Sequence, residues 1–227
     1  KKTDSTLTLV SEVFSKKINK ELKIKLSKKE SKIPESFDEM RLVVYTQPKL
    51  ASVGKKKPEI FEILIPKDVE AAKQLLEKEI KLTDVFKEGQ FVDVHAVTKG
   101  KGFQGTIKRF GLKIRQHKSE KTKRGAGSLG AWHPAKVDFR VPHAGQMGYH
   151  TRTEYNKWII KMGSDPKEIN PKGGFLHYGN VKNDYLLIKG SIAGSAKRLI
   201  RLVEPIRMNK KPNQAPEIKY INLESKQ

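Results

Sequence analysis

The chain has 227 residues, a formal charge of +22 at pH 7 and no cysteine, and 36% of its residues are hydrophobic. The absence of cysteine excludes a disulfide framework and any thiolate metal site, and the excess of Lys and Arg favours a nucleic acid or another polyanion as partner. No window approaches the roughly 18 apolar residues of a membrane-spanning helix, so we expect no membrane partner.

Regular structure is predicted in several stretches before residue 98. Apolar spacings of three and four from Val10 to Leu22 predict an amphipathic helix, and residues 68–80 fit a second helix with Asp68 near its start. Alternating or β-branched runs predict strands at residues 23–26, 41–47, 59–65 and 91–97.

More short strands are predicted near the end of the chain. Apolar runs separated by Gly, Pro and Asn turns favour strands at residues 155–162, 173–178, 185–188, 199–203 and 218–221. This spacing is typical of a small barrel or sandwich. The fold class expected is mainly β with some helix (α+β), with a long insertion between the two groups of strands.

Residues 99–161 concentrate charge, with 15 Lys and Arg against three acidic residues, a net of +12, and with 9 of the 17 glycines. From residue 111 to 152 only six side chains are Ile, Leu, Val or Met, too few to offset the entropy of ordering this length of chain. Glycine lets backbone approach phosphates, and arginine grips them with paired hydrogen bonds. We therefore expect a polyanion to order this stretch, with a glycine hinge at 100–105, an arginine-lined shaft and a tip at Trp132.

Residues 100–105 read Gly-Lys-Gly-Phe-Gln-Gly, the spacing of a dinucleotide-binding loop, with Glu120 at a suitable distance for a ribose. The residues that follow lack the apolar face of a helix that packs on a sheet, and no second strand–helix–strand unit follows. There is no P-loop either. The glycines are better explained by close approach of backbone to phosphate, so we expect no cofactor.

Three histidines, His133, His143 and His150, invite a metal or acid–base interpretation. Their spacings of ten and seven residues match no metal-site signature, so contact with RNA is favoured over catalysis. Trp132 has few apolar neighbours in sequence and is predicted to stack on RNA from an exposed loop, whereas Trp158 is predicted to be core. No nucleophile or carboxylate pair is recognisable, so we expect neither enzyme activity nor a metal.

Three longer motifs carry a family resemblance: Val-Thr-Lys-Gly-Lys-Gly-Phe-Gln-Gly at 97–105, Gly-Ala-Trp-His-Pro-Ala-Lys at 130–136, and Gly-Gln-Met-Gly-Tyr-His-Thr-Arg-Thr-Glu-Tyr-Asn-Lys at 145–157. In this order they resemble large-subunit ribosomal protein L-three in its archaeal or eukaryotic form. Shorter matches continue the resemblance at 173–179, 187–191 and 197–201. The family's N-terminal region is not matched and the chain starts without Met, so we expect a fragment of a soluble cytosolic protein.

The resemblance implies a translation-protein-like β-barrel with a long, non-globular basic extension that reaches through ribosomal RNA toward the peptidyl transferase centre. It implies that Trp132 is the fingertip tryptophan, near the accommodation route of aminoacyl-tRNA, and that Gln146 matches a glutamine methylated in the bacterial family. The expected function is a structural constituent of the large ribosomal subunit in the cytoplasm, which binds large-subunit rRNA and neighbouring ribosomal proteins, supports assembly and shapes the peptidyl transferase surroundings. The alternative is a free-standing RNA-binding factor or an RNA-modifying enzyme with a basic arm.

The expected organisation has three parts: a partly helical N-terminal region at 1–57, a barrel body at 58–98 and 153–227, and an RNA-penetrating extension at 99–152, called the basic segment below. The residues expected to bind rRNA are cationic, aromatic and polar side chains in or just after this segment: Lys99, Lys101, Gly102, Lys108, Arg109, Lys113, Arg115, His117, Lys121, Lys123, Arg124, Trp132, His133, Lys136, Arg140, His143, Gln146, Tyr149, His150, Arg152 and Lys157.

Overall fold

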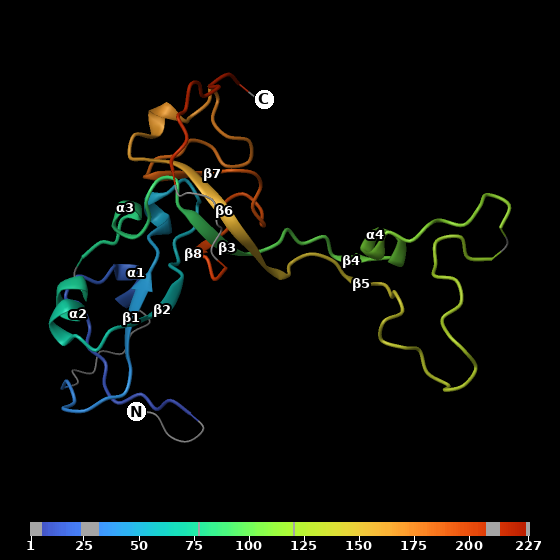
Figure 1. Cartoon of the computed structure of the whole chain (residues 1–227), viewed down its shortest axis with the longest axis horizontal. Helices are drawn as coiled ribbons and strands as arrows, with labels where there is room; N and C mark the ends of the chain where they lie inside the picture. The colour runs from blue at the N-terminus through green and yellow to red at the C-terminus, as the bar shows by residue number, and fades with distance from the viewer. Residues whose placement is uncertain (1–5, 24–31, 77, 120, 208–213, 226–227) are drawn as a thin grey trace. The chain divides into compact units, whose positions relative to one another are not determined.

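The computed structural model describes residues 6–23, 32–76, 78–119, 121–207 and 214–225. It is mainly sheet with a few short helices, which confirms the predicted α+β class (Figure 1). In chain order its elements are α1 (Lys20–Lys23), β1 (Met40–Tyr45), η1 (Pro48–Leu50), β2 (Ile60–Ile65), α2 (Val69–Leu76), α3 (Leu82–Val85), β3 (Phe91–Val97), β4 (Phe103–Gln104), α4 (Thr106–Phe110), β5 (Gly145–Gln146), β6 (Thr151–Gly163), η2 (Pro166–Glu168), β7 (Tyr185–Ile188) and β8 (Arg201–Val203).

The strands of the described residues form three separate sheets. β1 pairs with β2, β4 pairs with β5, and a four-stranded sheet has the order β7-β6-β3-β8. None of these sheets closes into a barrel, so the predicted barrel is not observed among the described residues. The chain divides into two compact units, the first made of Lys1–Gln90, Ile159–Leu187 and Asn213–Gln227, the second of Phe91–Trp158 and Ile188–Pro212.

In the first unit, β1 and β2 form an antiparallel pair that runs from Met40 opposite Ile65 to Tyr45 opposite Ile60. This confirms both strands predicted there. The helix predicted at 68–80 is confirmed as α2, although it ends at Leu76. Asp68 caps it, because its carboxylate accepts hydrogen bonds from the first backbone N–H groups of the helix.

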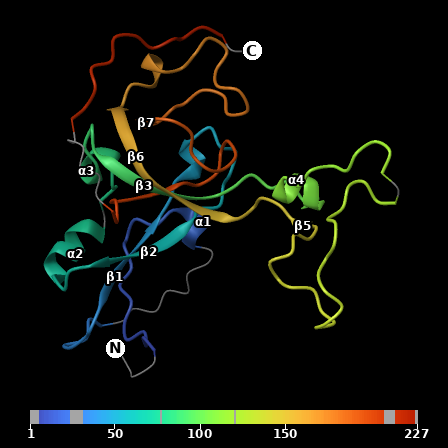
Figure 2. The ribbon, with the colours of Figure 1, turned by 45° about the vertical axis from the view of Figure 1, so that its right-hand side comes forward.

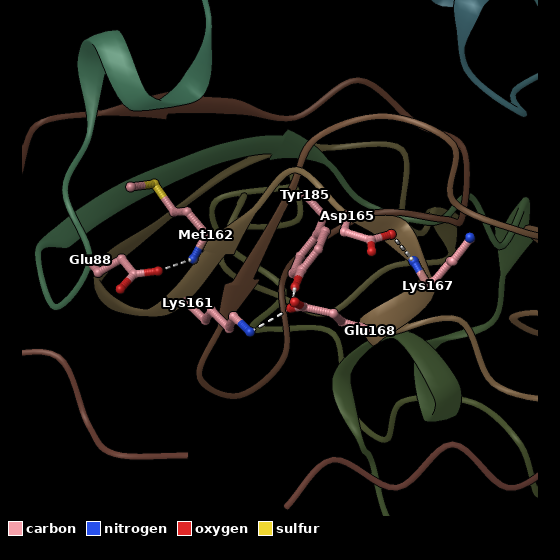
Figure 3. Close-up of polar contacts among 7 residues, drawn as sticks. All are labelled: Glu88, Lys161, Met162, Asp165, Lys167, Glu168 and Tyr185. Carbon is pink, nitrogen blue, oxygen red and sulfur yellow. Dashed lines mark hydrogen bonds and ion pairs between the residues drawn. The ribbon is translucent and has the colours of Figure 1, made fainter.

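A polar cluster ties η2 to the strands β6 and β7 in the first unit (Figure 3). The Glu168 carboxylate accepts hydrogen bonds from Lys161 Nζ at 2.6 Å and from the hydroxyl of the buried Tyr185 at 2.8 Å. Hydrogen bonding from Lys161, and next from Tyr185, holds the pKa of Glu168 below its usual value of 4.5. Gly163 makes room for this arrangement, because a Cβ there would lie 2.5 Å from the Tyr185 ring.

The second unit contains the most deeply buried strand, β3, which pairs with β6 on one side and β8 on the other. The run at residues 91–97 predicted this strand, and alternation of the kind that it shows is typical of a strand with one buried face. Phe91, Val92, Asp93 and Val94 are instead all buried, because a central strand is covered on both faces.

Asp93 is completely buried, at 0% exposure. The pairing of β3 with β6 shifts register at this position, and the opposing Asn156 has a positive φ of 53°, as in a β-bulge. The Asp93 carboxylate accepts the backbone N–H of Asn156 at 2.8 Å and that of Ile206 at 3.0 Å. One side chain therefore supplies acceptors that the interrupted ladder lacks.

Three predicted elements are wrong. The helix predicted from Val10 to Leu22 is limited to α1, because Leu9, Val10 and Val13 remain exposed and give an amphipathic face no packing energy. Residues 173–178 form a turn with positive φ at both glycines and at His177, and residues 218–221 join no ladder in the described chain. The strand predicted at 23–26 falls largely outside the described residues.

Candidate nucleic-acid interface

The basic segment begins and ends with paired backbone. Thr98 N–H donates to His150 O, Lys101 N–H to Met147 O and Met147 N–H to Gly102 O, each at 2.9 Å. β4 and β5 continue this pairing. We call residues 98–110 and 143–151 the neck. The predicted glycine hinge at 100–105 is therefore part of a hydrogen-bonded ladder.

Gly148 allows the two strands of the neck to approach. Its φ is +72°, and a Cβ there would lie 2.1 Å from Lys99 O and 3.1 Å from the Gly100 Cα. Both neighbouring atoms are backbone, so they cannot swing away as a flexible side chain would. Only glycine satisfies this position without moving the neck.

Arg109, on α4, holds the neck together. Its guanidinium donates to His143 O at 2.8 Å and to Gln146 O at 3.2 Å, and it lies 5.1 Å from the centroid of the Phe110 ring. Figures 1 and 2 both show α4 beside β5. Arg109 was predicted to bind rRNA, but its side chain is already occupied by protein carbonyls. The Gly-x-Gly-x-x-Gly run thus leads into the five-residue helix α4, which Arg109 fixes to the opposite strand of the neck. Glu120 lies outside the described residues.

Arg198 is a residue that the sequence analysis missed. Its Nη1 donates to Val97 O at 2.9 Å and Thr98 O at 2.7 Å, and its guanidinium lies 5.5 Å from the centroid of the Tyr149 ring. It therefore fixes the point where β3 passes into the neck. An arginine in a turn-rich stretch carries no sequence signal for such a long-range contact.

Between the two strands of the neck, residues 112–142 form what we call the distal loop. Its described residues contain no helix or strand, and most of them are exposed. Trp132 is 87% exposed, which confirms the prediction that it lies outside the core. Trp158 is half-buried beside Phe91, with ring centroids 6.4 Å apart, so it lies at the edge of the core, whereas the sequence predicted it within the core.

Most of the predicted rRNA-binding side chains face solvent. Of the 21 positions, only Arg109, His150 and Lys157 are half-buried, and the others are exposed. Lys157 pairs with Glu154 at 2.6 Å and donates to Ser191 O at 2.7 Å. Eight of the predicted cations have side chains with no hydrogen-bond or ion-pair partner among the described residues. They are Lys99, Lys101, Lys108, Lys113, Arg115, Lys121, Arg124 and Lys136. Whether any of these positions binds rRNA stays a prediction.

Arg140 is exposed but already paired. Its Nε and Nη2 donate to the two carboxylate oxygens of Asp138 at 3.0 and 2.9 Å, and its backbone N–H donates to the same carboxylate at 2.8 Å. These hydrogen bonds lower the pKa of Asp138 and raise that of Arg140.

The histidines of the basic segment are not gathered into a site. His133 and His143 are exposed in different parts of the segment, and His150 takes part in the neck through its backbone. Within the described ranges, no three His, Cys, Asp or Glu side chains are placed to hold a metal ion. No helix in those ranges is long and apolar enough to cross a membrane.

Exposed cations and aromatic rings on a segment without a core are typical of a protein that binds a polyanion. Comparison with known proteins makes this class specific. A family model described as Ribosomal protein L3 matches residues 7–227, and the chain belongs to this family. The resemblance seen in the motifs is thereby confirmed.

Three similar proteins come from archaea. The Large ribosomal subunit protein uL3 of Methanocaldococcus jannaschii is 49% identical over 97% of this chain and 71% of its own length. Proteins of the same name from Methanococcus vannielii and Methanobrevibacter smithii are 46% and 44% identical, each over 100% of this chain and 73% of the relative. The predicted archaeal type is consistent with all three.

Proposed function

We propose that this chain is a structural constituent of the large ribosomal subunit in the cytoplasm, which binds large-subunit rRNA and neighbouring ribosomal proteins. In this proposal the basic segment is the main rRNA-binding part. It supports subunit assembly and shapes the surroundings of the peptidyl transferase centre without performing chemistry. Family membership supports the ribosomal role.

The observation that carries the proposal is the contrast in the basic segment between abundant cations and few protein partners. Nine of its exposed Lys and Arg side chains find no partner among the described residues: the eight named above and Lys118. Unpaired cations on a loop of this length repel one another, and phosphate is the group that offsets this repulsion. Phosphate contacts also order backbone that has no apolar core.

Cofractionation tests the ribosomal role. The full chain, tagged and expressed in an archaeal host, should stay with large subunits through a high-salt wash, because it is embedded in rRNA rather than bound at the surface. A free-standing RNA-binding factor or RNA-modifying enzyme would be released by the same wash. Recovery of the chain only in the free-protein fraction would contradict the proposal.

Salt dependence tests the role of the basic segment. Arg124→Ala should weaken binding of the full chain to protein-free large-subunit rRNA and lower the slope of log affinity against log salt by about 1, as for loss of one phosphate contact. Lys67→Ala, at an exposed cation outside the segment, is the matched control and should leave the slope unchanged. Equal slopes of log affinity against log salt for both variants would mean that the basic segment is not part of the rRNA interface.

The finer features of the proposal follow the family resemblance. The three-part organisation, a barrel-type body and a basic extension, remains part of what we propose for the protein in its subunit. Trp132 is proposed to act at the fingertip, where it influences tRNA accommodation indirectly. Its exposure supports this role, since a ring outside the core is available to RNA.

A further inference from the structure

One exposed ring in the distal loop is held differently from the others. Phe139 is 93% exposed, the highest exposure among the large hydrophobic residues described. Single exposed apolar side chains are common on protein surfaces, so exposure alone indicates no site. The arrangement around this ring does.

Residues 138–141 form a tight turn, in which Val141 N–H donates to Asp138 O at 3.1 Å. Aspartate is favoured at the first position of such a turn, where its side chain accepts the N–H two residues later. Here that N–H belongs to Arg140, at 2.8 Å. Phe139 is therefore a central residue of a turn whose shape is fixed locally, and its ring is exposed to solvent.

Asp138 also fixes the side chain of Arg140. Both carboxylate oxygens are used, by Nε at 3.0 Å and Nη2 at 2.9 Å, and the guanidinium then lies 5.9 Å from the centroid of the Phe139 ring. A planar cation beside an aromatic ring is a stacking surface, because both groups attract the flat face of a nucleobase.

The charge pattern adds an independent argument. Asp138 is the only acidic residue between Glu120 and Glu154 in the sequence. An aspartate in this position weakens attraction to phosphate, and both of its carboxylate oxygens accept hydrogen bonds from Arg140 within the turn. What it does in the structure is hold Arg140 beside Phe139.

We propose that residues 138–140 are a preformed stacking site for an unpaired RNA base, in which Phe139 supplies the ring and Asp138 positions Arg140 beside it. This inference rests on the proposed RNA-binding function and assigns one kind of ligand to one place in the basic segment. An unpaired base fits better than an apolar protein side chain, because the surrounding segment is strongly cationic and a base brings its own phosphate.

The test uses the full chain and two probes, a 12-nucleotide single-stranded oligoadenylate and a 12-base-pair RNA duplex. Phe139→Ala should weaken single-strand binding by roughly 5- to 150-fold, the range for loss of one base–aromatic stack. Duplex binding should stay within about twofold, because bases in a duplex are already stacked. The salt slope should not change, since no cation is lost.

Asp138→Asn separates stacking from simple attraction. Asparagine still caps the turn but adds one positive charge to the segment and releases the Arg140 guanidinium. Attraction alone predicts tighter binding to both probes, whereas the stacking site predicts tighter duplex binding with weaker single-strand binding. In the double variant, Asp138→Asn should cause no further single-strand loss beyond that of Phe139→Ala, because the two residues act on one contact.

Tyr220→Ala is the matched control, since Tyr220 is an exposed aromatic residue outside the basic segment, and it should bind both probes as wild type does. Unchanged single-strand affinity in Phe139→Ala, or tighter binding of both probes by Asp138→Asn, would overturn the stacking site alone. A wild-type chain that binds neither probe would overturn the proposed RNA binding and the site with it.

Discussion

In the second unit, the strands around Asp93 and the distal loop differ in where their polar groups find partners. Asp93 receives two backbone N–H groups from segments 63 and 113 residues away in sequence, and apolar strand residues surround it. In the distal loop, the hydrogen bonds join residues at most eight positions apart, from the turn at Asp138 to the bond between Arg115 N–H and Lys123 O. Long-range order is therefore built into the sheet, whereas the distal loop has only local order of its own.

The largest expected effect is on the sheet. Asp93→Ala leaves the backbone N–H groups of Asn156 and Ile206 without the acceptor that they share in part-buried hydrogen bonds, and a group of this kind costs about 1–3 kcal/mol when it is buried. The free energy of unfolding should fall by about 3 kcal/mol or more, measured by urea denaturation of the full chain. The exposed Asp184→Ala is the matched control and should change stability by less than about 0.5 kcal/mol. Similar changes in the free energy of unfolding for both variants would mean that Asp93 does not stabilise the sheet.

The neck lies between the two regions compared, and Gly148→Ala tests it. This substitution combines strain from a positive φ with a clash against Lys99 O, and φ strain alone costs about 1–3 kcal/mol. Gly102→Ala is the matched control, because its φ is +66° but a Cβ there meets no atom within 4 Å. Hydrogen exchange at the Lys101 and Met147 amides should accelerate far more in Gly148→Ala. Equal acceleration would mean that the strands of the neck have room to separate.

A smaller effect concerns acid stability in the first unit. The pKa of Glu168 is lowered chiefly by hydrogen bonding from Lys161, so its contribution is fully present above the unfolded value near 4.5 and is lost as pH falls through the folded value. Glu168→Gln should therefore lose less stability than wild type in denaturation between about pH 6 and pH 3. Glu217→Gln, at an exposed position, should follow the wild-type curve. If the stability of Glu168→Gln fell with pH as steeply as that of wild type, the contribution assigned to the Glu168 carboxylate would be contradicted.

The smallest effect on stability is expected in the distal loop. Trp132→Ala should leave the free energy of unfolding within about 0.5 kcal/mol of wild type, because the ring is exposed and contributes little to the core. It should nevertheless alter tRNA accommodation in reconstituted large subunits, measured by the rate of dipeptide formation. A much lower melting temperature of the isolated variant would show that Trp132 packs in the protein after all.

The strands were the most predictable part of the fold. β-branched and aromatic runs located β1, β2, β3 and β7 from local pattern alone, because these segments are short, apolar and bounded by turn residues. The N-terminal helix failed for the converse reason. Its apolar spacing was correct, but spacing stabilises a helix only where another surface covers the face, and Leu9 and Val10 are exposed.

In the candidate interface, the sequence predicted which side chains are exposed better than what those side chains contact. Trp132 and most of the cations are exposed as expected, since few apolar residues surround them. The roles of Arg109 and Arg198 were not predictable, because each donates to carbonyls 34 to 101 residues away in sequence. Composition shows that an arginine is present but not whether protein or phosphate satisfies it.

The hydrogen bonds from Arg109 to His143 O and Gln146 O also bring the two ends of the distal loop together. A loop whose ends are fixed in this way tolerates changes in length, since doubling it costs only about 0.6 kcal/mol in closure entropy. Insertions or deletions between residues 112 and 142 should therefore leave the strands on the other side of the neck undisturbed. The reach of the loop can then vary independently of the fold that carries it.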